Sequence, residues 1–154
     1  MKSAKFDISY MRMAHVWAEN SHCKRKKVGA LIVKDNMIIS DGFNGTPSGM
    51  DNCCEDADGE TKWEVIHAEA NAILKLTNAH NSCEGATLYI TLSPCRNCSK
   101  LILSSKIRRV VYGRMHSDDS GIMFLRDNGV LVHQLDLEIE SSYTIKNINH
   151  TGGF

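Results

Sequence analysis

Four residues of this sequence have types and spacings that could build a reactive metal site. His67 and Glu69 stand two residues apart at the head of the apolar stretch VIHAEANAIL, and Cys95 and Cys98 stand three residues apart. Thiolate sulfur and neutral imidazole nitrogen are ligands that zinc prefers, and a catalytic zinc keeps a fourth position open for water. The set therefore predicts a zinc site with His67, Cys95 and Cys98 as ligands.

The geometry of helix ends explains how these residues could converge. Cys95 and Cys98 fall at the start of a predicted helix, so their side chains lie on nearly the same side, where the positive helix N-terminus favours thiolates. His67 and Glu69 would point in nearly opposite directions inside a helix, so they share a site only if the helix end faces the metal. Zinc with two thiolates and one imidazole has little net charge, and a water beside it then needs a base. We expect Glu69 to be that base and not a fourth ligand.

Each part of the set also has an ordinary structural explanation. A single histidine at a helix start is usually structural, and a lone C-x-x-C pair also occurs in structural zinc sites and redox pairs. The combination of H-x-E, a following strand and P-C-x-x-C is far more specific than either part.

The elements that must position these residues follow from the periodicity of the sequence. Apolar residues at helical spacing from Phe6 to Trp17 predict a helix over residues 4–19. A hairpin, a long loop rich in Gly, Asn and Asp, and alternating helices and strands then follow. The predicted ranges are strands at 28–33, 37–43, 86–91, 107–113 and 130–135, the loop at 44–60, and helices at 65–76, 94–105 and 120–129.

The order of these elements, α-β-β-α-β-α-β-α-β, predicts an α/β fold. We expect a three-layer α-β-α domain around a mixed five-stranded sheet, in which the later strands run parallel through helical crossovers. The length of 154 residues suits one hydrophobic core, so we expect a single domain over residues 1–154. No helix or strand is predicted for the polar tail after about residue 136.

Composition narrows the class of protein. The 18 Lys and Arg residues balance the 18 Asp and Glu residues, so no overall field gathers nucleic acid, although a small anionic substrate is still compatible. No apolar run reaches the roughly 20 residues that cross a bilayer, and the N-terminus lacks the apolar region of a signal peptide. We therefore expect a cytoplasmic protein with no membrane or nucleic-acid partner. In that compartment its six cysteines indicate metal ligands or buried thiols and not disulfides.

The sequence resembles a known group of enzymes at this set of residues. HAE (67–69) and PCRNC (94–98) resemble the signature of the zinc-dependent cytidine deaminase superfamily. The resemblance to its deoxycytidylate (dCMP) deaminase family extends over roughly residues 5–135. The segments that carry it are KVGALIVKDNMIISDGFNGTPSG (27–49), NCCED (52–56), VIHAEANAILK (65–75), SCEGATLYITLSPCRNCSKLI (82–102), IRRVVY (107–112) and DDSGI (118–122).

This resemblance implies a cytidine-deaminase-like fold and a zinc hydrolase that converts dCMP to dUMP and ammonia for dTMP synthesis. Glu69 would take a proton from water, protonate the ring at N3 and later pass a proton to the departing amine. Asn44 would hydrogen-bond the sugar or the base. The backbone at Ala68 and Ser93 would read the edge of the base, with Ser93 near the exocyclic amine.

A nucleotide substrate also needs a cation for its 5′-phosphate. The run KRKK (24–27) precedes the first strand, and Lys27 is the position we predict, although a basic turn of this kind can also be merely solvated. Family members often carry an aromatic and a basic residue before the last helix, where this chain has His116 and Ser117. His116 can stack or contact phosphate, and Arg114 is the nearest alternative cation.

Three further cysteines raise the prospect of a second, structural zinc, which some family members hold. Cys23 and Cys53 match the two places that contribute ligands, and His22 or Cys54 could add to them. The sequence lacks the additional histidines that would complete such a site, and without a second zinc these residues are ordinary buried thiols. Cys83 is interpreted as structural.

The resemblance also implies a homohexamer that dCTP activates and dTTP inhibits together with Mg²⁺. Two other functions remain open at this point. One is a tRNA adenosine deaminase or another nucleobase deaminase, which would share the metal motif. The other is a non-catalytic zinc module that binds a partner, although such a module has no use for Glu69 beside an open metal position.

Overall fold

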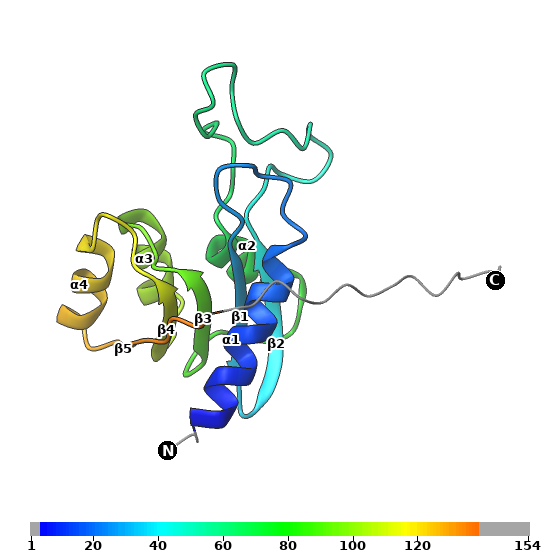
Figure 1. Cartoon of the computed structure of the whole chain (residues 1–154). Coiled ribbons are helices and arrows are strands. Elements are labelled where there is room, and N and C mark those ends of the chain that lie inside the picture. Colours follow the sequence, from blue (N-terminus) through cyan, green and yellow to red (C-terminus); the bar gives the residue numbers. More distant parts are fainter. Residues whose placement is uncertain (1–3, 139–154) are drawn as a thin grey trace, which may run out of the picture.

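The computed structural model describes residues 4–138, in which five strands form one mixed sheet (Figure 1). The strand order is β2-β1-β3-β4-β5; β1 pairs antiparallel with β2 and β3, and β3-β4 and β4-β5 are parallel. This confirms the predicted α/β fold with a mixed five-stranded sheet. The strands are β1 (Gly29–Lys34), β2 (Met37–Phe43), β3 (Thr87–Leu92), β4 (Arg109–Arg114) and β5 (Leu131–Gln134).

Helices cover both faces of this sheet. They are α1 (Ala4–Ala18), α2 (Ala68–Lys75), α3 (Arg96–Ser104) and α4 (Ser120–Asp127), with a short 3₁₀ helix η1 (Leu76–Asn78) after α2. Among the described helices, α1 alone packs on one face, as its position across the strands in Figure 1 shows, and α2, α3 and α4 pack on the other. Residues 139–154, which make up most of the predicted tail, lie outside the described residues, so the single domain over 1–154 stays a prediction.

The alternation of side chains along each strand produces two separate cores. In β1, Ala30 and Ile32 face α2, α3 and α4, whereas Leu31 and Val33 face α1. A period of two residues places neighbouring side chains on opposite faces of a sheet. Because β1 is buried on both faces up to Val33, its sequence is an apolar run from Gly29 to Val33.

Tyr89 connects α1 to the centre of the sheet. Its hydroxyl donates a 2.6 Å hydrogen bond to Asp7 Oδ1 in α1, and Arg109 donates to both oxygens of the same carboxylate at 2.9 and 2.7 Å. Burial and the Asp7 carboxylate both raise the pKa of Tyr89, which keeps the hydroxyl protonated as a donor. A charged, bidentate contact of this kind fixes the direction of α1 on the sheet.

Gly42 allows α2 to approach β2 closely. A Cβ atom at this position would lie 2.3 Å from the carbonyl oxygen of Ala68 and 2.7 Å from the backbone nitrogen of Ala72. The missing side chain therefore determines how near the first turn of α2 sits to the sheet. Among residues 4–138, no helix has the length and apolar character needed to cross a membrane.

Candidate active site

The metal-type residues lie at the N-terminal ends of two helices. His67 is the N-cap of α2, with extended backbone angles of φ −69° and ψ 155°, and Cys95 is the N-cap of α3, with Cys98 one turn further on. The helices begin later than the predicted residues 65 and 94, because the capping residues are extended and the preceding Ile66 pairs with Gly45. Both helix ends direct partial positive charge toward the same point, where thiolates are stabilised.

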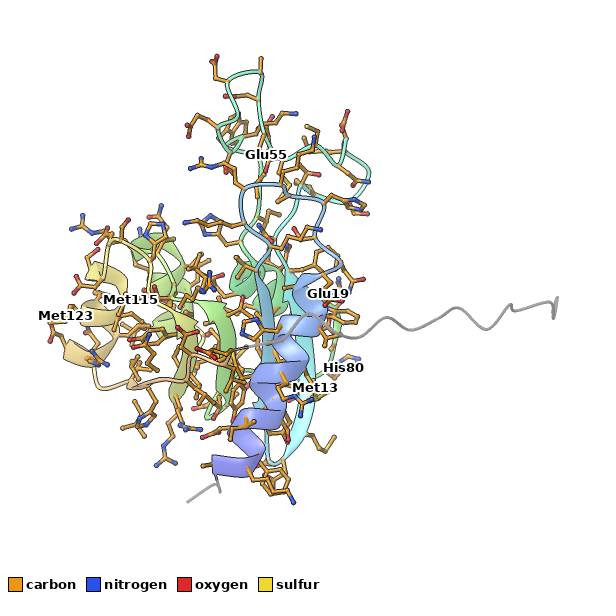
Figure 2. The ribbon with its side chains drawn as sticks, viewed as in Figure 1. Met13, Glu19, Glu55, His80, Met115 and Met123 are labelled. Carbon is orange, nitrogen blue, oxygen red and sulfur yellow. A yellow bond between two sulfur atoms is a disulfide. The ribbon has the colours of Figure 1, made fainter. Side chains whose placement is uncertain are left out.

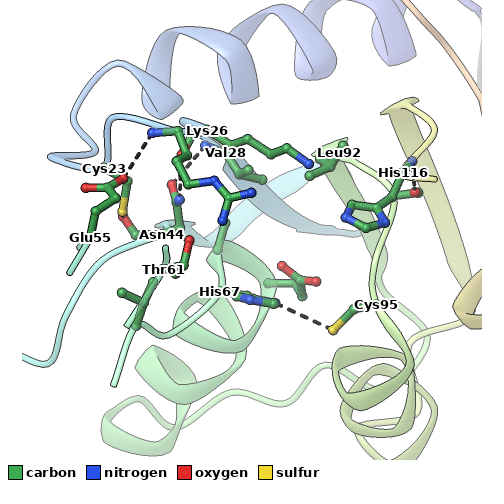
Figure 3. A pocket seen from close by; sticks show the side chains of 15 residues that line it. Cys23, Lys26, Val28, Asn44, Glu55, Thr61, His67, Leu92, Cys95 and His116 are labelled. Atoms are coloured by element: carbon green, nitrogen blue, oxygen red, sulfur yellow. Dashed lines mark hydrogen bonds between the residues drawn. The ribbon is translucent and has the colours of Figure 1, made fainter. Parts of the chain in front are cut away.

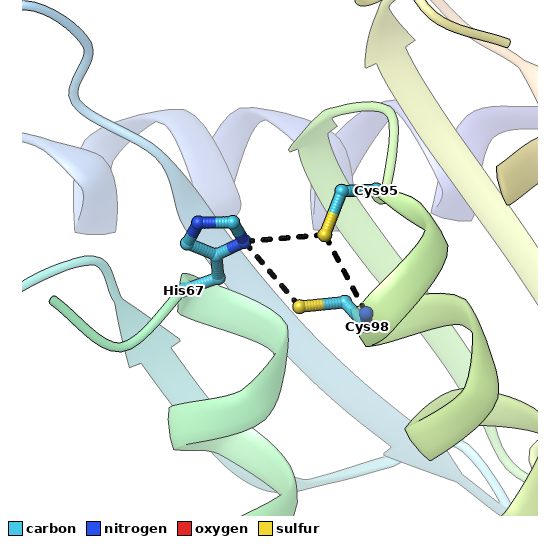
Figure 4. Close-up of side chains that lie close together, drawn as sticks. All are labelled: His67, Cys95 and Cys98. Carbon is cyan, nitrogen blue, oxygen red and sulfur yellow. Dashed lines mark hydrogen bonds between the residues drawn. The ribbon is translucent and has the colours of Figure 1, made fainter. Parts of the chain in front are cut away.

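The three predicted ligands converge with a geometry that fits zinc. His67 Nδ1 lies 3.4 Å from Cys98 Sγ and 3.6 Å from Cys95 Sγ (Figure 4). Zinc bonds of ordinary length at a tetrahedral angle separate nitrogen and sulfur by roughly 3.5 Å. Within the described residues this is the one group of three or more His, Cys, Asp or Glu side chains that could hold a metal ion. The residues present therefore fit the zinc ion that the motif implies.

The protons of this cluster are unevenly distributed. Hydrogen bonds from Cys98 and His67 lower the pKa of Cys95 to about 3, so Cys95 is a thiolate. The hydrogen bond that the Cys98 thiol donates to Cys95, with burial and nearby negative charge, raises the pKa of Cys98. The Cys95 hydrogen bond also raises the pKa of His67. A cation must displace the protons that Cys98 and His67 keep, because only the deprotonated groups act as ligands.

Glu69 is almost entirely buried beside this cluster. It sits in the first turn of α2, two residues after His67, and has 2% of its surface exposed. Burial raises the pKa of Glu69 above the ordinary carboxyl value. A carboxyl with a raised pKa that lines a cavity next to a metal-type cluster is suited to accept and return a proton.

A cavity of about 220 Å³ opens above the cluster (Figure 3). Its floor holds His67, Glu69 and Cys95, and its wall is formed by the two loops that follow α1 and β2. Eight predicted residues are thereby brought together. They are Cys23, Asn44, His67, Ala68, Glu69, Ser93 and Cys95, with His116 at the rim.

Asn44 uses its carboxamide to hold one of these loops. Its Oδ1 accepts a hydrogen bond from the backbone nitrogen of Val28 at 2.9 Å, and its Nδ2 donates to the carbonyl of Lys26 at 2.8 Å. Ser93 acts similarly on the other side, because its hydroxyl accepts a 2.7 Å bond from the backbone nitrogen of His116. Both side chains are buried, so they fix the backbone that shapes the cavity.

Other predicted site residues lie elsewhere. Lys27 and Arg114 do not line the cavity. Burial is the main factor that lowers the pKa of His15 in α1, and the charge of Arg114 adds to it, so Arg114 lies close to that helix. Cys98 lies beneath the cavity floor as a buried member of the metal-type cluster.

The expectation that the cysteines form no disulfide is wrong for one pair. Cys23 is bonded to Cys54, and the neighbouring Cys53 is an exposed free thiol. The predicted pair Cys23 and Cys53 therefore does not come together as metal ligands in this form of the chain. Cys83 is buried and free, in agreement with a structural interpretation.

Several lining residues were not singled out by their sequence pattern. Arg25 and Lys26 line the cavity from the basic run, and Glu55 and Thr61 line it from the long loop. Alternation cannot reveal such residues, because an irregular loop has no fixed period. Asn71 was also missed: its Nδ2 donates to the carbonyls of Phe43 and Ile66 at 2.9 and 3.4 Å, and so fastens the residue before His67 to the end of β2.

The fold and the site together define a class of protein. Two helix N-termini that present His, Cys and Cys, with a buried glutamate beside them and an α-β-α sandwich behind, are the arrangement of a zinc-dependent hydrolytic deaminase. The family model described as "Cytidine and deoxycytidylate deaminase zinc-binding region" matches residues 4–114. The chain belongs to this deaminase family.

Individual relatives agree with this assignment. A deoxycytidylate deaminase of Mycobacterium phage D29 is 37% identical over 126 residues, which cover 73% of this chain and 97% of the relative. The deoxycytidylate deaminase of Enterobacteria phage T4 is 30% identical over a match that covers 93% of this chain and 96% of the relative. A crystal structure of the dCMP deaminase from cyanophage S-TIM5, in complex with dCMP and dUMP, superposes with a TM-score of 0.86 and 40% identity, covering 88% of this chain and all of that one. The chain is therefore an enzyme of the deoxycytidylate deaminase type.

Proposed function

We propose that this chain catalyses the hydrolytic deamination of dCMP to dUMP and ammonia, a reaction that feeds dTMP synthesis. The observation that carries this proposal is one cavity with a His-Cys-Cys cluster and buried Glu69 at its floor, and Arg25 and Lys26 on its wall. A pyrimidine nucleotide has the reacting amine at one end and a 5′-phosphate at the other, which matches this distribution. The cyanophage relative, described in complex with dCMP and dUMP, supports the same substrate.

Zinc bound by His67, Cys95 and Cys98 would supply Lewis acidity and lower the pKa of water in the cavity. Glu69 would accept the proton of that water and deliver it to N3 of the ring as oxygen adds to C4. It would then carry the hydroxyl proton to the exocyclic nitrogen, the C4–N4 bond would break, and ammonia would leave. The raised pKa of Glu69 suits a group that must hold a proton between these two transfers.

We assign recognition of the base to backbone groups at the two helix ends. The N–H of Ala68 is in the first turn of α2, where a helix leaves its N–H groups without internal partners, so it can donate to the carbonyl of the base. The N–H of Ser93 already donates to the carbonyl of Arg114, which leaves the Ser93 carbonyl to accept from the exocyclic amine. Asn44 keeps a second amide hydrogen for the sugar.

We assign the 5′-phosphate first to Lys26 and Arg25. Both line the cavity, and among the four ion pairs of the described residues none involves Lys26. Lys26 can therefore meet a phosphate without breaking a salt bridge, whereas Arg25 pairs with Glu60. His116 at the rim is a further phosphate or stacking contact, and the predicted Lys27 and Arg114 would act from outside the cavity wall.

The remaining predictions belong to the same proposal. Apolar side chains exposed on α1, Phe6 at 55%, Met13 at 46% and Val16 at 57%, offer a surface for the homohexamer. Activation by dCTP, inhibition by dTTP with Mg²⁺, a second structural zinc and a cytoplasmic location stay predictions. Light scattering measures the oligomeric state, effector titrations measure the responses to dCTP and dTTP, and a zinc count per chain detects a second zinc.

A side-by-side assay of dCMP, deoxycytidine and tRNA tests the proposed reaction. We expect ammonia release and a uracil spectrum from dCMP, with a much higher KM for deoxycytidine because it lacks the phosphate. Turnover of tRNA adenosine with none of dCMP would refute the proposal and favour the other nucleobase deaminases of this family.

A further inference from the structure

A disulfide joins the two loops that form the cavity wall. Cys23 lies in the loop between α1 and β1 and lines the cavity, and Cys54 lies in the segment 44–67 between β2 and α2. Both residues are buried, with 3% and 0% of their surface exposed. The deamination reaction described above makes no use of this bond.

The segment 44–67 has little regular structure to hold it in place. It contains no helix or strand, only isolated bridges between Gly45 and Ile66 at its base and between Glu55 and Thr61 further out. Figure 2 shows it as the loop that carries Glu55 and extends beyond the sheet. Long loops with few buried contacts open most readily in a folded protein.

At their base the two loops are also joined through Asn44, which accepts hydrogen bonds from the Ser21 hydroxyl and the Val28 backbone nitrogen and donates one to the Lys26 carbonyl. Further out, the other contacts between the loops are exposed and polar. Glu55 Oε1 accepts hydrogen bonds from the backbone nitrogens of Lys24 and Arg25 at 2.7 and 3.0 Å, and Arg25 pairs with Glu60 at 2.8 Å. The two side chains of that ion pair are 47% and 69% exposed, so solvent screens it strongly. Beyond Asn44, the covalent bond is therefore the contact on which the position of the segment 44–67 against the first loop most depends.

We propose that the Cys23–Cys54 disulfide is a redox latch that sets the affinity of the cavity for its anionic substrate. In the reducing compartment predicted for this chain, a disulfide of this kind is typically transient and redox-sensing. Closing the latch joins the two sulfurs, and the two thiol protons and two electrons pass to a small disulfide, which leaves as two thiols. A thiol pair reverses the exchange and is itself oxidised.

The latch acts on binding and not on the proton transfers. Cys23 lines the cavity wall together with Arg25 and Lys26, which are assigned to the phosphate. Glu69, which is assigned to the proton transfers, lies on the first turn of α2. When the bond is reduced, the loops hold the binding geometry for only part of the time. If that fraction falls to between a third and a tenth, the apparent KM rises roughly three- to tenfold while kcat changes little.

The test compares oxidised and reduced zinc enzyme, and it rests on the proposed function only for the choice of dCMP as substrate. A small disulfide oxidises the protein and a phosphine reduces it, because a dithiol would compete for zinc. Mass spectrometry verifies the state of Cys23 and Cys54, zinc is counted, hydrogen exchange is followed over 44–67, and kcat and KM are measured. Cys54→Ser should behave like the reduced enzyme in both conditions, and the control Cys53→Ser should keep the full response.

Each outcome bears on the latch separately from the reaction. Faster exchange of 44–67 and a higher KM after reduction support the latch. Equal exchange in both states overturns it whatever the substrate, and so does faster exchange with an unchanged KM. A second zinc taken up by the reduced thiols, with KM unaltered, would replace the latch by a structural metal site. Absence of dCMP turnover in both states refutes the proposed function, while the exchange measurement still tests the loops.

Discussion

Replacement of Glu69 by Gln tests the proposed chemistry most directly. The change keeps the size and shape of a side chain that is 98% buried and removes only its ability to accept and return a proton. A positioned general acid–base contributes roughly 10²- to 10⁴-fold to a rate. Because the proposed mechanism uses Glu69 in both the attack of water and the departure of ammonia, we expect a loss in kcat near the upper limit. A 10⁴-fold loss corresponds to about 5.4 kcal/mol of transition-state stabilisation.

The expected changes in binding and folding are small. KM for dCMP should stay within a few-fold, because Glu69 lies at the floor with the metal-type ligands and the assigned phosphate contacts lie on the wall. Burial disfavours the ionised form of Glu69 and raises its pKa. In the metal-free chain, the contribution of Glu69 to the free energy of unfolding is therefore fully present at low pH and is lost as pH rises through the folded-state pKa of Glu69. An uncharged Gln removes that loss, so metal-free Glu69→Gln should gain stability over wild type with rising pH.

The assay combines initial rates, a zinc count and thermal unfolding for three proteins: wild type, Glu69→Gln and a control. The exposed Glu19 at the end of α1 supplies the control, since Glu19→Gln alters charge equally at a distance from the cavity. A Glu69→Gln enzyme that binds a full complement of zinc and keeps more than a tenth of the wild-type kcat would refute the assignment of Glu69 as proton carrier.

Three other perturbations follow from the geometry. Zinc binding should release about two protons near pH 6, because the pKa values of His67 and Cys98 are raised. Calorimetry should therefore show that zinc affinity falls steeply as the pH is lowered, and a pH-independent affinity would contradict the assigned ligands. Lys26→Ala should raise KM for dCMP about tenfold, which is the loss expected for one hydrogen bond to a charged group, and should leave deoxycytidine turnover unchanged. An equal or larger effect of Lys27→Ala would show that Lys27 binds the phosphate. Gly42→Ala should destabilise the fold by about 1–3 kcal/mol, because its Cβ would overlap the α2 backbone, and an unchanged melting temperature would show that α2 can move away.

Local motifs explain why the metal-type cluster could be predicted from the sequence. His67 with Glu69 and Cys95 with Cys98 are each set by a spacing of two or three residues at a helix start, so the backbone geometry of one turn fixes their relation. The sheet was equally accessible, because β1 and β3 are apolar runs of strand length. These local patterns do not show that the two helix N-termini lie together in space, and only the family resemblance predicted that they do.

The cavity wall could not be predicted in the same way. KRKK lies in a loop, where no periodicity decides whether Lys26 or Lys27 faces inward; the decision depends on Asn44, which holds the carbonyl of Lys26 from 18 residues away. The choice of Cys54 over Cys53 as partner of Cys23 likewise depends on how a long loop folds back. Contacts of this type are determined by tertiary packing and leave no pattern in the local sequence.

The site is therefore divided between a rigid half and an adjustable half, and the division should be visible in kinetics. The groups assigned to the reacting atoms lie on helix ends fastened to the sheet, for example by Asn71, which donates to the carbonyls of both Phe43 and Ile66. The groups assigned to the phosphate lie on a loop that Asn44 fastens at Lys26 and Val28, and that the disulfide and exposed polar contacts join to the outer part of 44–67. Changes in the first half, such as Asn71→Ala, should lower kcat, because small displacements of reacting groups are costly, whereas changes in the loops should raise KM. Variants in both halves that alter kcat and KM in the same proportion would show that the site moves as one unit.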